Sequence, residues 1–300
     1  MPERLAVIGG SGLNHMNGLE LLEEGPVETP YGDPSGPVRR MRLEGRELLF
    51  LPRHGPGHRI PPHAINYRAN ICALKKLGAT QVLSVSAVGS LRPELAPGDL
   101  VVVDQFVDLT KRRRSTFFED GIVAHVSMAD PVCAPLRRQL HAVTARALRS
   151  ISEDERPRLH DGGTYVCIEG PQFSSRAESE LYRRWGLDVI GMTNMPEAKL
   201  AREAELSYAT LALVTDYDCW HESEAAVEVE AVVATLKRTI RHAERAIRGL
   251  LAELEPSGQR SARRALASAV ITPPGARPAA AQERLAWLLD APGNPRPSTP

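Results

Sequence analysis

The chain has 300 residues, of which 37 are basic and 37 acidic, so its formal net charge is zero. This balance argues against a dedicated nucleic-acid-binding protein, which carries a surplus of lysine and arginine to neutralise phosphates. Hydrophobic residues make up 42% of the chain and charged residues 25%, a composition that excludes a wholly disordered protein.

No stretch of the sequence predicts a membrane segment, an export signal or a metal site. The apolar runs all fall short of the roughly 18 residues that cross a bilayer, and residues 1–4 do not begin a signal peptide. The four cysteines are far apart and offer neither a disulfide framework nor a zinc template. The sequence therefore predicts a cytoplasmic protein without nucleic-acid or membrane partners.

Seven short apolar runs predict the strands of a buried sheet. They are Leu5–Ile8, Leu48–Leu51, Gln81–Val85, Leu100–Val103, Thr164–Ile168, Asp188–Ile190 and Tyr208–Val214. Several are nearly continuous rather than alternating, which is typical of strands covered on both faces.

Segments with helical spacing alternate with these runs. They are His63–Leu77, Leu136–Ile151, a helix opened by serine caps at Ser174-Ser175, one that begins at Pro196-Glu197, and one from about Glu222 to Leu254. Alternating strands and helices predict an α/β fold, a three-layer α/β/α sandwich around a mixed, mainly parallel central sheet. We expect residues 1–255 to form this single domain.

The composition changes after Glu255. Residues 256–300 hold eight prolines and many alanines, and within them only Arg284–Asp290 predicts a short helix. We expect a flexible tail, with a partner-docking segment as the alternative.

A glycine turn follows the first predicted strand. In Gly9-Gly10-Ser11-Gly12 the backbone N–H groups can point at an anion, and the Ser11 hydroxyl adds a donor. The segment does not complete the G-x-G-x-x-G pattern, so a dinucleotide site is disfavoured. A purely structural turn remains open.

Two further strand ends carry groups suited to a phosphate-sized anion. Arg53-His54 places a guanidinium fork beside an imidazole, and Ser84–Ser90 runs from a strand into small residues with exposed N–H groups and hydroxyls. A surface pair on a loop is the alternative for the first. We read the triplet Arg112-Arg113-Arg114 as a solvated loop because the overall charge is balanced.

The most informative segment runs from Thr215 to Trp220. Asp216 and Asp218 follow an apolar strand, and residues two apart in an extended chain face the same way. Two close carboxylates can hold different protonation states, so that one donates while the other accepts. A metal site and a solvated loop are the alternatives, although no third ligand lies at metal-ligand spacing.

Eight segments together make the chain resemble a known family. They are Ile8–Leu13, Glu28–Gly32, Arg53–Gly55, Asn66–Asn70, Gly98-Asp99, Glu169–Ser179, Met192–Glu197 and Thr215–Trp220. Their order over residues 4–254 closely resembles the 5′-methylthioadenosine phosphorylases of the trimeric purine nucleoside phosphorylase superfamily, with the tail outside the resemblance.

The resemblance implies a role for each matching position. The phosphate would lie against Ser11, Arg53, His54, Ser86, Ala87 and Thr193, where serine at position 11 replaces the commoner threonine. Met192 would pack on the ribose and Phe173 on the base, while Asp216 and Asp218 would face the purine. Ser174 and Val229 match positions linked to substrate choice. The family also implies a homotrimer that needs no metal or organic cofactor, with inorganic phosphate as co-substrate.

The expected reaction is phosphorolysis of 5′-methylthioadenosine to adenine and 5-methylthio-D-ribose 1-phosphate. Relatives that cleave 6-oxo purines carry asparagine where this chain has Asp216, so we expect Asp216 to protonate N7 and Asp218 to bind the 6-amino group. A broader phosphorylase that takes adenosine or methylthioinosine is the nearest alternative. A non-catalytic nucleoside-binding protein and a dinucleotide-binding oxidoreductase are the alternatives from other classes.

Overall fold

The computed structural model describes residues 3–10, 12–13, 16–221, 229–257 and 261–289, with only the backbone for 229–231. Within these ranges, eleven strands form one sheet. They are β1 (Leu5–Gly9), β2 (Leu19–Gly25), β3 (Val38–Leu43), β4 (Arg46–Pro52), β5 (Gln81–Ser90), β6 (Leu100–Val103), β7 (Gln105–Asp108), β8 (Leu159–Asp161), β9 (Thr164–Cys167), β10 (Val189–Gly191) and β11 (Ser207–Asp216).

The sheet is mixed and mostly parallel. Parallel pairing joins β5 to β1 and to β11, β1 to β4, β6 to β8, and β9 to β7 and β10. Antiparallel pairing joins β2 to β3, β3 to β4, β5 to β10 and β6 to β11. Because β7 follows β6 directly, the path β5–β11–β6/β7–β9–β10 returns to β5 and closes one end of the sheet into a ring.

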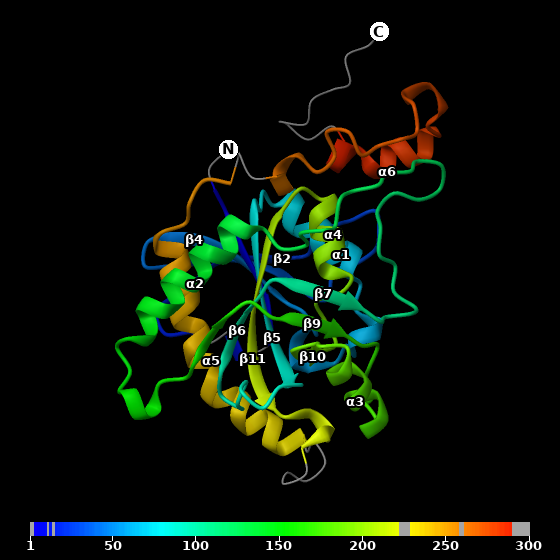
Figure 1. The fold of residues 1–300 in the computed structure, drawn as a ribbon. Helices are drawn as coiled ribbons and strands as arrows, with labels where there is room; N and C mark the ends of the chain where they lie inside the picture. The colour runs from blue at the N-terminus through cyan, green and yellow to red at the C-terminus, as the bar shows by residue number, and fades with distance from the viewer. Residues whose placement is uncertain (1–2, 11, 14–15, 222–228, 258–260, 290–300) are drawn as a thin grey trace.

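Helices cover both faces of the sheet. They are α1 (Tyr67–Lys76), α2 (Ala134–Leu148), α3 (Arg176–Arg184), α4 (Glu197–Glu203), α5 (Val229–Ala252) and α6 (Ala279–Leu289). Figure 1 shows α2 and α5 on one side of the strands and α1 and α4 on the other. The expected three-layer α/β/α sandwich is confirmed.

The apolar runs explain why both faces are covered. Along β1, Leu5 and Val7 pack with the core beneath α2 and α5, while Ala6 and Ile8 pack with the core beneath α1 and α4. Successive side chains of a strand point to opposite faces, so a continuous apolar run needs a helix layer on each.

Local signals position two of the helices as expected. Ser175 caps α3 in a capping box with Glu178, in which the Ser175 hydroxyl accepts from the Glu178 N–H and the Glu178 carboxylate accepts from the Ser175 N–H. Pro196 immediately precedes α4. Of the predicted long helix, the structure describes Val229–Ala252 as α5, and the expected start near Glu222 lies outside the described residues.

Residues 261–289 contradict the expectation of a flexible tail. Leu266, Ala269, Leu285 and Leu288 are buried in the same core as α1 and α4. The backbone N–H of Leu266 donates to the Glu205 carboxylate at 2.9 Å. Proline content suggested disorder, but the apolar side chains between the prolines find a matching surface on the body, and their burial outweighs the ordering entropy.

The predicted short helix in this segment is longer than expected. It begins at Ala279 rather than Arg284 and runs to Leu289, while Asp290 lies outside the described residues. The Trp287 ring lies 5.0 Å from that of Phe117 and 6.4 Å from that of Tyr31, which ties α6 (red in Figure 1) to loops of the body.

Candidate active site

The centre of the candidate site is a stretch of β5 where its neighbours diverge. On one edge, β1 pairs with β5 only as far as Ser84, and β10 pairs with it only from Gly89 onward. Since β1 is parallel to β5 and β10 is antiparallel, the carboxyl ends of both strands point toward residues 85–88. Ligands of open α/β sheets bind where strands diverge in this way, because loops and free backbone groups meet there.

Ser86, Ala87 and Thr193 come together at this position. The Ser86 hydroxyl lies 3.1 Å from the Thr193 hydroxyl, and the Tyr165 hydroxyl accepts from the Thr193 N–H at 3.3 Å. A Cβ on Gly191 would lie 2.0 Å from the Tyr165 hydroxyl, so only glycine allows this approach. Ser86 on β5 and Thr193 just after β10, two of the expected phosphate residues, therefore form a cluster of hydroxyl groups with Tyr165.

Arg53 is placed differently from what an exposed phosphate ligand requires. Its side chain is 2% exposed and forms a two-pronged ion pair with Glu197, at 2.9 Å from Nε and 3.2 Å from Nη2. Nη1 donates to the Val85 carbonyl at 3.0 Å, and Nη2 donates to the Ser84 hydroxyl at 2.6 Å. The guanidinium therefore lies behind β5 and fixes the strand that carries Ser86.

Glu197 is a residue that the sequence reasoning missed. Its carboxylate also accepts from the Tyr208 hydroxyl at 2.9 Å. Burial by itself lowers the pKa of the Arg53 guanidinium, but the adjacent Glu197 carboxylate more than offsets this effect and raises that pKa. The only signal in the sequence was Pro196-Glu197, which indicated a helix start and nothing about a partner for Arg53.

His54 is neutral near pH 7. Its Nδ1 lies 2.9 Å from the Ile60 carbonyl, and its ring stacks on His58 with the centroids 4.1 Å apart. Burial lowers the pKa of His54 to about 4, although the hydrogen bond to Ile60 opposes the shift. A neutral ring that donates from Nδ1 to a carbonyl keeps Nε2 as a hydrogen-bond acceptor.

The two aspartates lie at the end of β11, against the same strand β5. The Asp216 Oδ1 accepts from the Asp218 N–H at 2.9 Å, and a Cβ on Gly89 would lie 2.9 Å from that oxygen. Asp218 is 6% exposed and has a left-handed backbone, with φ of 50°. Such a conformation is uncommon in a residue other than glycine, although aspartate adopts it more readily than most, and strained backbone of this kind clusters at functional sites.

The environment of the pair favours a retained proton. Burial raises the pKa of the Asp218 carboxyl, and the charge of Asp216 adds to that rise. The Thr215 hydroxyl lies 2.6 Å from the Asp216 Oδ2 and 3.1 Å from the Val88 carbonyl oxygen. The Thr215 hydroxyl has one hydrogen and can donate it fully to only one of these two oxygens. Both contacts are hydrogen bonds only when the Asp216 carboxyl also carries a hydrogen, which it donates to Thr215.

The residues expected at the base and ribose lie on two neighbouring loops. Gly170 lies against Met192, because a Cβ on this glycine would be 2.4 Å from the Met192 Sδ. Phe173 is 47% exposed, and the Ser174 carbonyl accepts from the Cys219 thiol at 3.3 Å, next to the aspartates. Ser11 lies outside the described residues, as does the side chain of Val229.

Arg113 contradicts the expectation of a solvated loop at residues 112–114. Arg112 and Arg114 are exposed, but the Arg113 side chain is 1% exposed and pairs with Glu169 at 2.9 Å. Its guanidinium also donates to backbone carbonyls of both loops that carry the expected ribose and base residues. No signal in a run of three arginines distinguishes the buried one.

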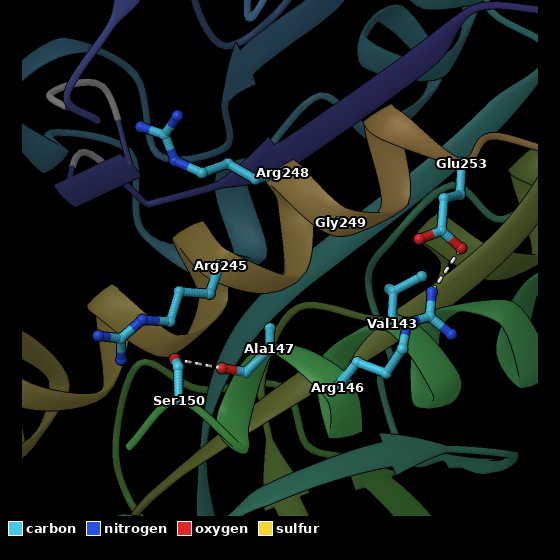
Figure 2. A pocket seen from close by; sticks show the side chains of 8 residues that line it. All are labelled: Val143, Arg146, Ala147, Ser150, Arg245, Arg248, Gly249 and Glu253. Carbon is cyan, nitrogen blue, oxygen red and sulfur yellow. Dashed lines mark hydrogen bonds and ion pairs between the residues drawn. The ribbon is translucent and has the colours of Figure 1, made fainter.

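A hollow of about 380 Å³ lies elsewhere, between α2 and α5. Figure 2 shows Arg245 and Arg248 extending away from Glu253, which pairs with Arg146. It contains none of the residues expected at the site, and its arginines already have protein partners, including Glu44 for Arg248. We assign no role in the reaction to it.

Two searches of the described ranges gave negative results. None of the helices in the described part of the chain has the length and apolarity needed to cross a membrane. Among the same residues, histidine, cysteine, aspartate and glutamate do not gather in threes in a way that could hold a metal ion.

The fold and the arrangement at β5 define the class. The sequence model of the phosphorylase superfamily matches residues 4–252, and the chain belongs to that superfamily. Within it, the chain belongs to the S-methyl-5′-thioadenosine phosphorylases, as its motifs indicated. It is 50% identical over 290 residues to that enzyme from Geobacter sulfurreducens, covering 96% of this chain and 99% of the relative. It is 53% identical over 253 residues to that from Hyperthermus butylicus, covering 84% and 89%.

Solved structures agree. A methylthioadenosine phosphorylase from an antarctic soil metagenomic library superposes with a TM-score of 0.88 at 50% identity, covering 95% of this chain and 98% of that one. The Schistosoma mansoni enzyme in complex with tubercidin gives 0.78 at 36% identity, covering 85% and 94%. An alignment of 290 residues must extend past residue 255, so the expectation that the tail lies outside the resemblance is wrong.

Proposed function

We propose that this protein is a pentosyltransferase that cleaves 5′-methylthioadenosine with inorganic phosphate, releasing adenine and 5-methylthio-D-ribose 1-phosphate. One observation carries the proposal: β5 has a cluster of hydroxyl groups where β1 and β10 diverge, and the aspartate pair at the end of β11 lies beside Gly89 of the same β5 strand. An anion site and a carboxyl pair along one strand suit an anionic nucleophile and a basic leaving group.

Phosphate recognition relies on neutral donors. Ser86 and Thr193 offer hydroxyls, and the stretch of β5 around Ala87, with which neither β1 nor β10 pairs, offers backbone N–H groups, with Ser11 completing the set. Arg53 acts from behind the strand, where Glu197 neutralises most of its charge and its hydrogen bonds fix Ser84 and Val85. A neutral His54 accepts, at Nε2, the hydrogen of the hydrogenphosphate ion.

The base is recognised by the aspartate pair. The Asp216 carboxyl, which contacts the Thr215 hydroxyl, donates a hydrogen to N7 of adenine. Asp218 accepts a hydrogen bond from the 6-amino group. Burial raises the pKa of the Asp218 carboxyl and the charge of Asp216 adds to that rise, so binding a proton between the pair and the base is favoured. Phe173 flanks the base, and Met192 packs against the ribose.

The reaction then needs one bond to break and one to form. The C1′–N9 bond electrons move onto the base as N7 takes the proton of Asp216, and a phosphate oxygen bonds to C1′ from the opposite face. The protein orients the phosphate and stabilises the departing base, and it uses no cofactor. Ser174 and Val229 contribute to substrate choice, as the family resemblance implies.

We extend the proposal to a cytoplasmic homotrimer, as the family resemblance implies. An exposed apolar pair supports a subunit contact: Val123 and Ile271 are 46% and 61% exposed and adjacent, with the Ile271 N–H donating to the Val123 carbonyl at 2.9 Å. Light scattering of the purified protein checks the mass, which is 98.4 kDa for three chains of 32.8 kDa each.

The test measures kcat/KM for methylthioadenosine, adenosine and methylthioinosine, with and without phosphate. We expect adenine release that requires phosphate and is fastest from methylthioadenosine. Similar rates on all three nucleosides would favour the broader phosphorylase, and nucleoside binding without phosphate-dependent cleavage would overturn the proposal. In Asp216→Asn we expect preference to move toward the 6-oxo nucleoside, and an unchanged preference would refute the assignment to N7.

A further inference from the structure

Arg113 lies at the junction of the two loops that carry the expected nucleoside contacts. It belongs to the connection that follows β7, and its side chain is 1% exposed although Arg112 and Arg114 on either side are exposed. A buried arginine needs a partner for its charge and acceptors for its hydrogens. Glu169 supplies the charge, with its Oε1 at 2.9 Å from the Arg113 Nε.

The remaining hydrogens of Arg113 reach backbone carbonyls of both loops. Nη1 donates at 2.7 Å to the carbonyls of Met192 and Met195, the two residues that bracket Thr193 and Asn194. Nη2 donates at 2.6 Å to the Glu169 carbonyl and at 3.3 Å to that of Ile168. One planar group therefore bridges the loop after β9 and the loop after β10.

This bridge begins where the sheet stops. The β9–β10 ladder ends at the pair Cys167 and Gly191, and the Ile168 N–H still donates to the Gly191 carbonyl at 2.9 Å. Beyond that point strand pairing does not fix the spacing of the two chains. Arg113 fixes this spacing instead, because its rigid guanidinium donates hydrogen bonds to carbonyls of both loops at set positions.

A third segment is attached to the same group. The Tyr67 hydroxyl accepts from the Arg113 Nη1 at 2.9 Å and donates to the Pro62 carbonyl at 2.9 Å. Pro62 lies in the connection between β4 and α1 that begins with Arg53 and His54, on the phosphate side. The guanidinium also lies 5.3 Å from the centre of the Tyr67 ring.

We infer that Arg113 is a positioning residue that sets the distance between the ribose and phosphate contacts at 192–193 and the base contact at Phe173. It touches neither substrate in this role, which rests on the proposed function. The contacts on both loops hold the bound substrates, so changing their spacing by about 1 Å should weaken substrate binding as well as lower the rate, which by itself can fall by about 10²-fold. The geometry of the bridge should therefore be visible in the affinity for both substrates.

Steady-state kinetics on the full chain test the inference with Arg113→Met, Arg113→Lys and the matched control Arg112→Met. We expect Arg113→Met to raise KM for nucleoside and for phosphate by about tenfold or more. Arg113→Lys should recover part of the loss, since lysine keeps the charge without the fork. Arg112→Met should stay within about twofold of wild type. KM does not depend on the fraction of folded enzyme, so unchanged KM values with a lower kcat would overturn the inference.

Amide hydrogen exchange provides a readout that needs no activity. In Arg113→Lys we expect faster exchange in residues 168–174 and 191–196, with β1 and β4 unchanged. If Arg113→Met does not fold, Arg113→Lys still decides: wild-type exchange in both segments would refute the positioning role. If the wild-type protein shows no phosphorolysis, the proposed function is refuted. The hydrogen-exchange result then still decides whether Arg113 positions the two loops.

Discussion

Two charged centres lie along β5, and they are built in opposite ways. The Arg53–Glu197 centre brings opposite charges together, buried to 2% and 1% exposure, with a serine and a tyrosine hydroxyl completing its hydrogen bonds. The aspartate pair, Asp216 and Asp218, brings like charges together at the end of β11, with one residue in a left-handed conformation.

The difference separates support from chemistry. Opposite charges that satisfy each other contribute a fixed framework, and their removal exposes an uncompensated charge. Like charges held side by side make one carboxyl retain a proton, which a ligand with a basic nitrogen and an amino group can use. The Arg53–Glu197 centre should therefore dominate stability, and the aspartate pair should dominate catalysis.

The largest effect should follow the loss of Arg53. Arg53→Met leaves the buried Glu197 carboxylate without its partner, so we expect the free energy of unfolding to fall by about 3–5 kcal/mol in urea titrations. The double variant Arg53→Met with Glu197→Leu should recover part of that loss. A single variant as stable as wild type would remove the first half of the comparison.

Asp216→Ala should separate activity from stability. Loss of the proton donor should lower kcat/KM for methylthioadenosine by about 10²–10⁴-fold, the usual contribution of general acid catalysis. The melting temperature should not fall, because the variant also removes one of two adjacent acidic groups. A variant that loses stability and keeps its activity would reverse the roles of the two centres.

Acid should destabilise the phosphate side. The pKa of His54 is lowered to about 4 from 6.5, so the folded protein stays neutral where the unfolded chain takes up a proton. The unfolded state then binds more protons, and the free energy of unfolding falls as pH drops from about 6.5 to about 4. Urea titrations across that window check the slope, which His54→Gln should reduce. Burial also lowers the pKa of His58, so part of the slope should remain in this variant.

The smallest effect, with the opposite sign, should come from Asp218. Because the folded state raises the pKa of this carboxyl, its contribution to stability is present at low pH and is lost as pH rises through that pKa. Asp218→Asn should therefore raise the free energy of unfolding at pH 7 by about 0.5–1 kcal/mol, the lower end of the interaction energies between contacting groups. The gain should vanish near pH 3, and asparagine tolerates the left-handed backbone. A gain independent of pH would contradict the titration.

The elements that the sequence failed to predict have a common cause. Strands β2 and β3 are rich in charged residues and show no apolar run, yet they pair through ion pairs such as Arg39 with Glu24 and Arg42 with Glu20. Their stability comes from the partner strand, as cross-strand pairs contribute where the strand alone does not. The tail was misread for the same reason, because its apolar residues need the surface of the body.

The site residues that the sequence could predict are those whose role depends on neighbours close in the chain. The carboxylates at 216 and 218 could be read from their spacing and the Ser86 hydroxyl from the end of an apolar run, whereas Thr193 was named only through the family resemblance. The partner of Arg53 is 144 residues away in the chain, so no local pattern connects the two. Arg113 gave no signal, since one arginine of three is buried only by the way two loops close over it.

By itself the sequence determined the strands with continuous apolar runs, the serine cap of α3 and the motifs that identify the family. These depend on backbone propensity, side-chain spacing and residue chemistry, which act over a few residues. Only the tertiary structure decided that Arg53 supports β5 from behind, that Arg113 joins two loops, and that residues 261–289 belong to the core. Burial and charge pairing depend on which distant segments meet, and the balanced 37 and 37 charges of the chain acquire their roles only there.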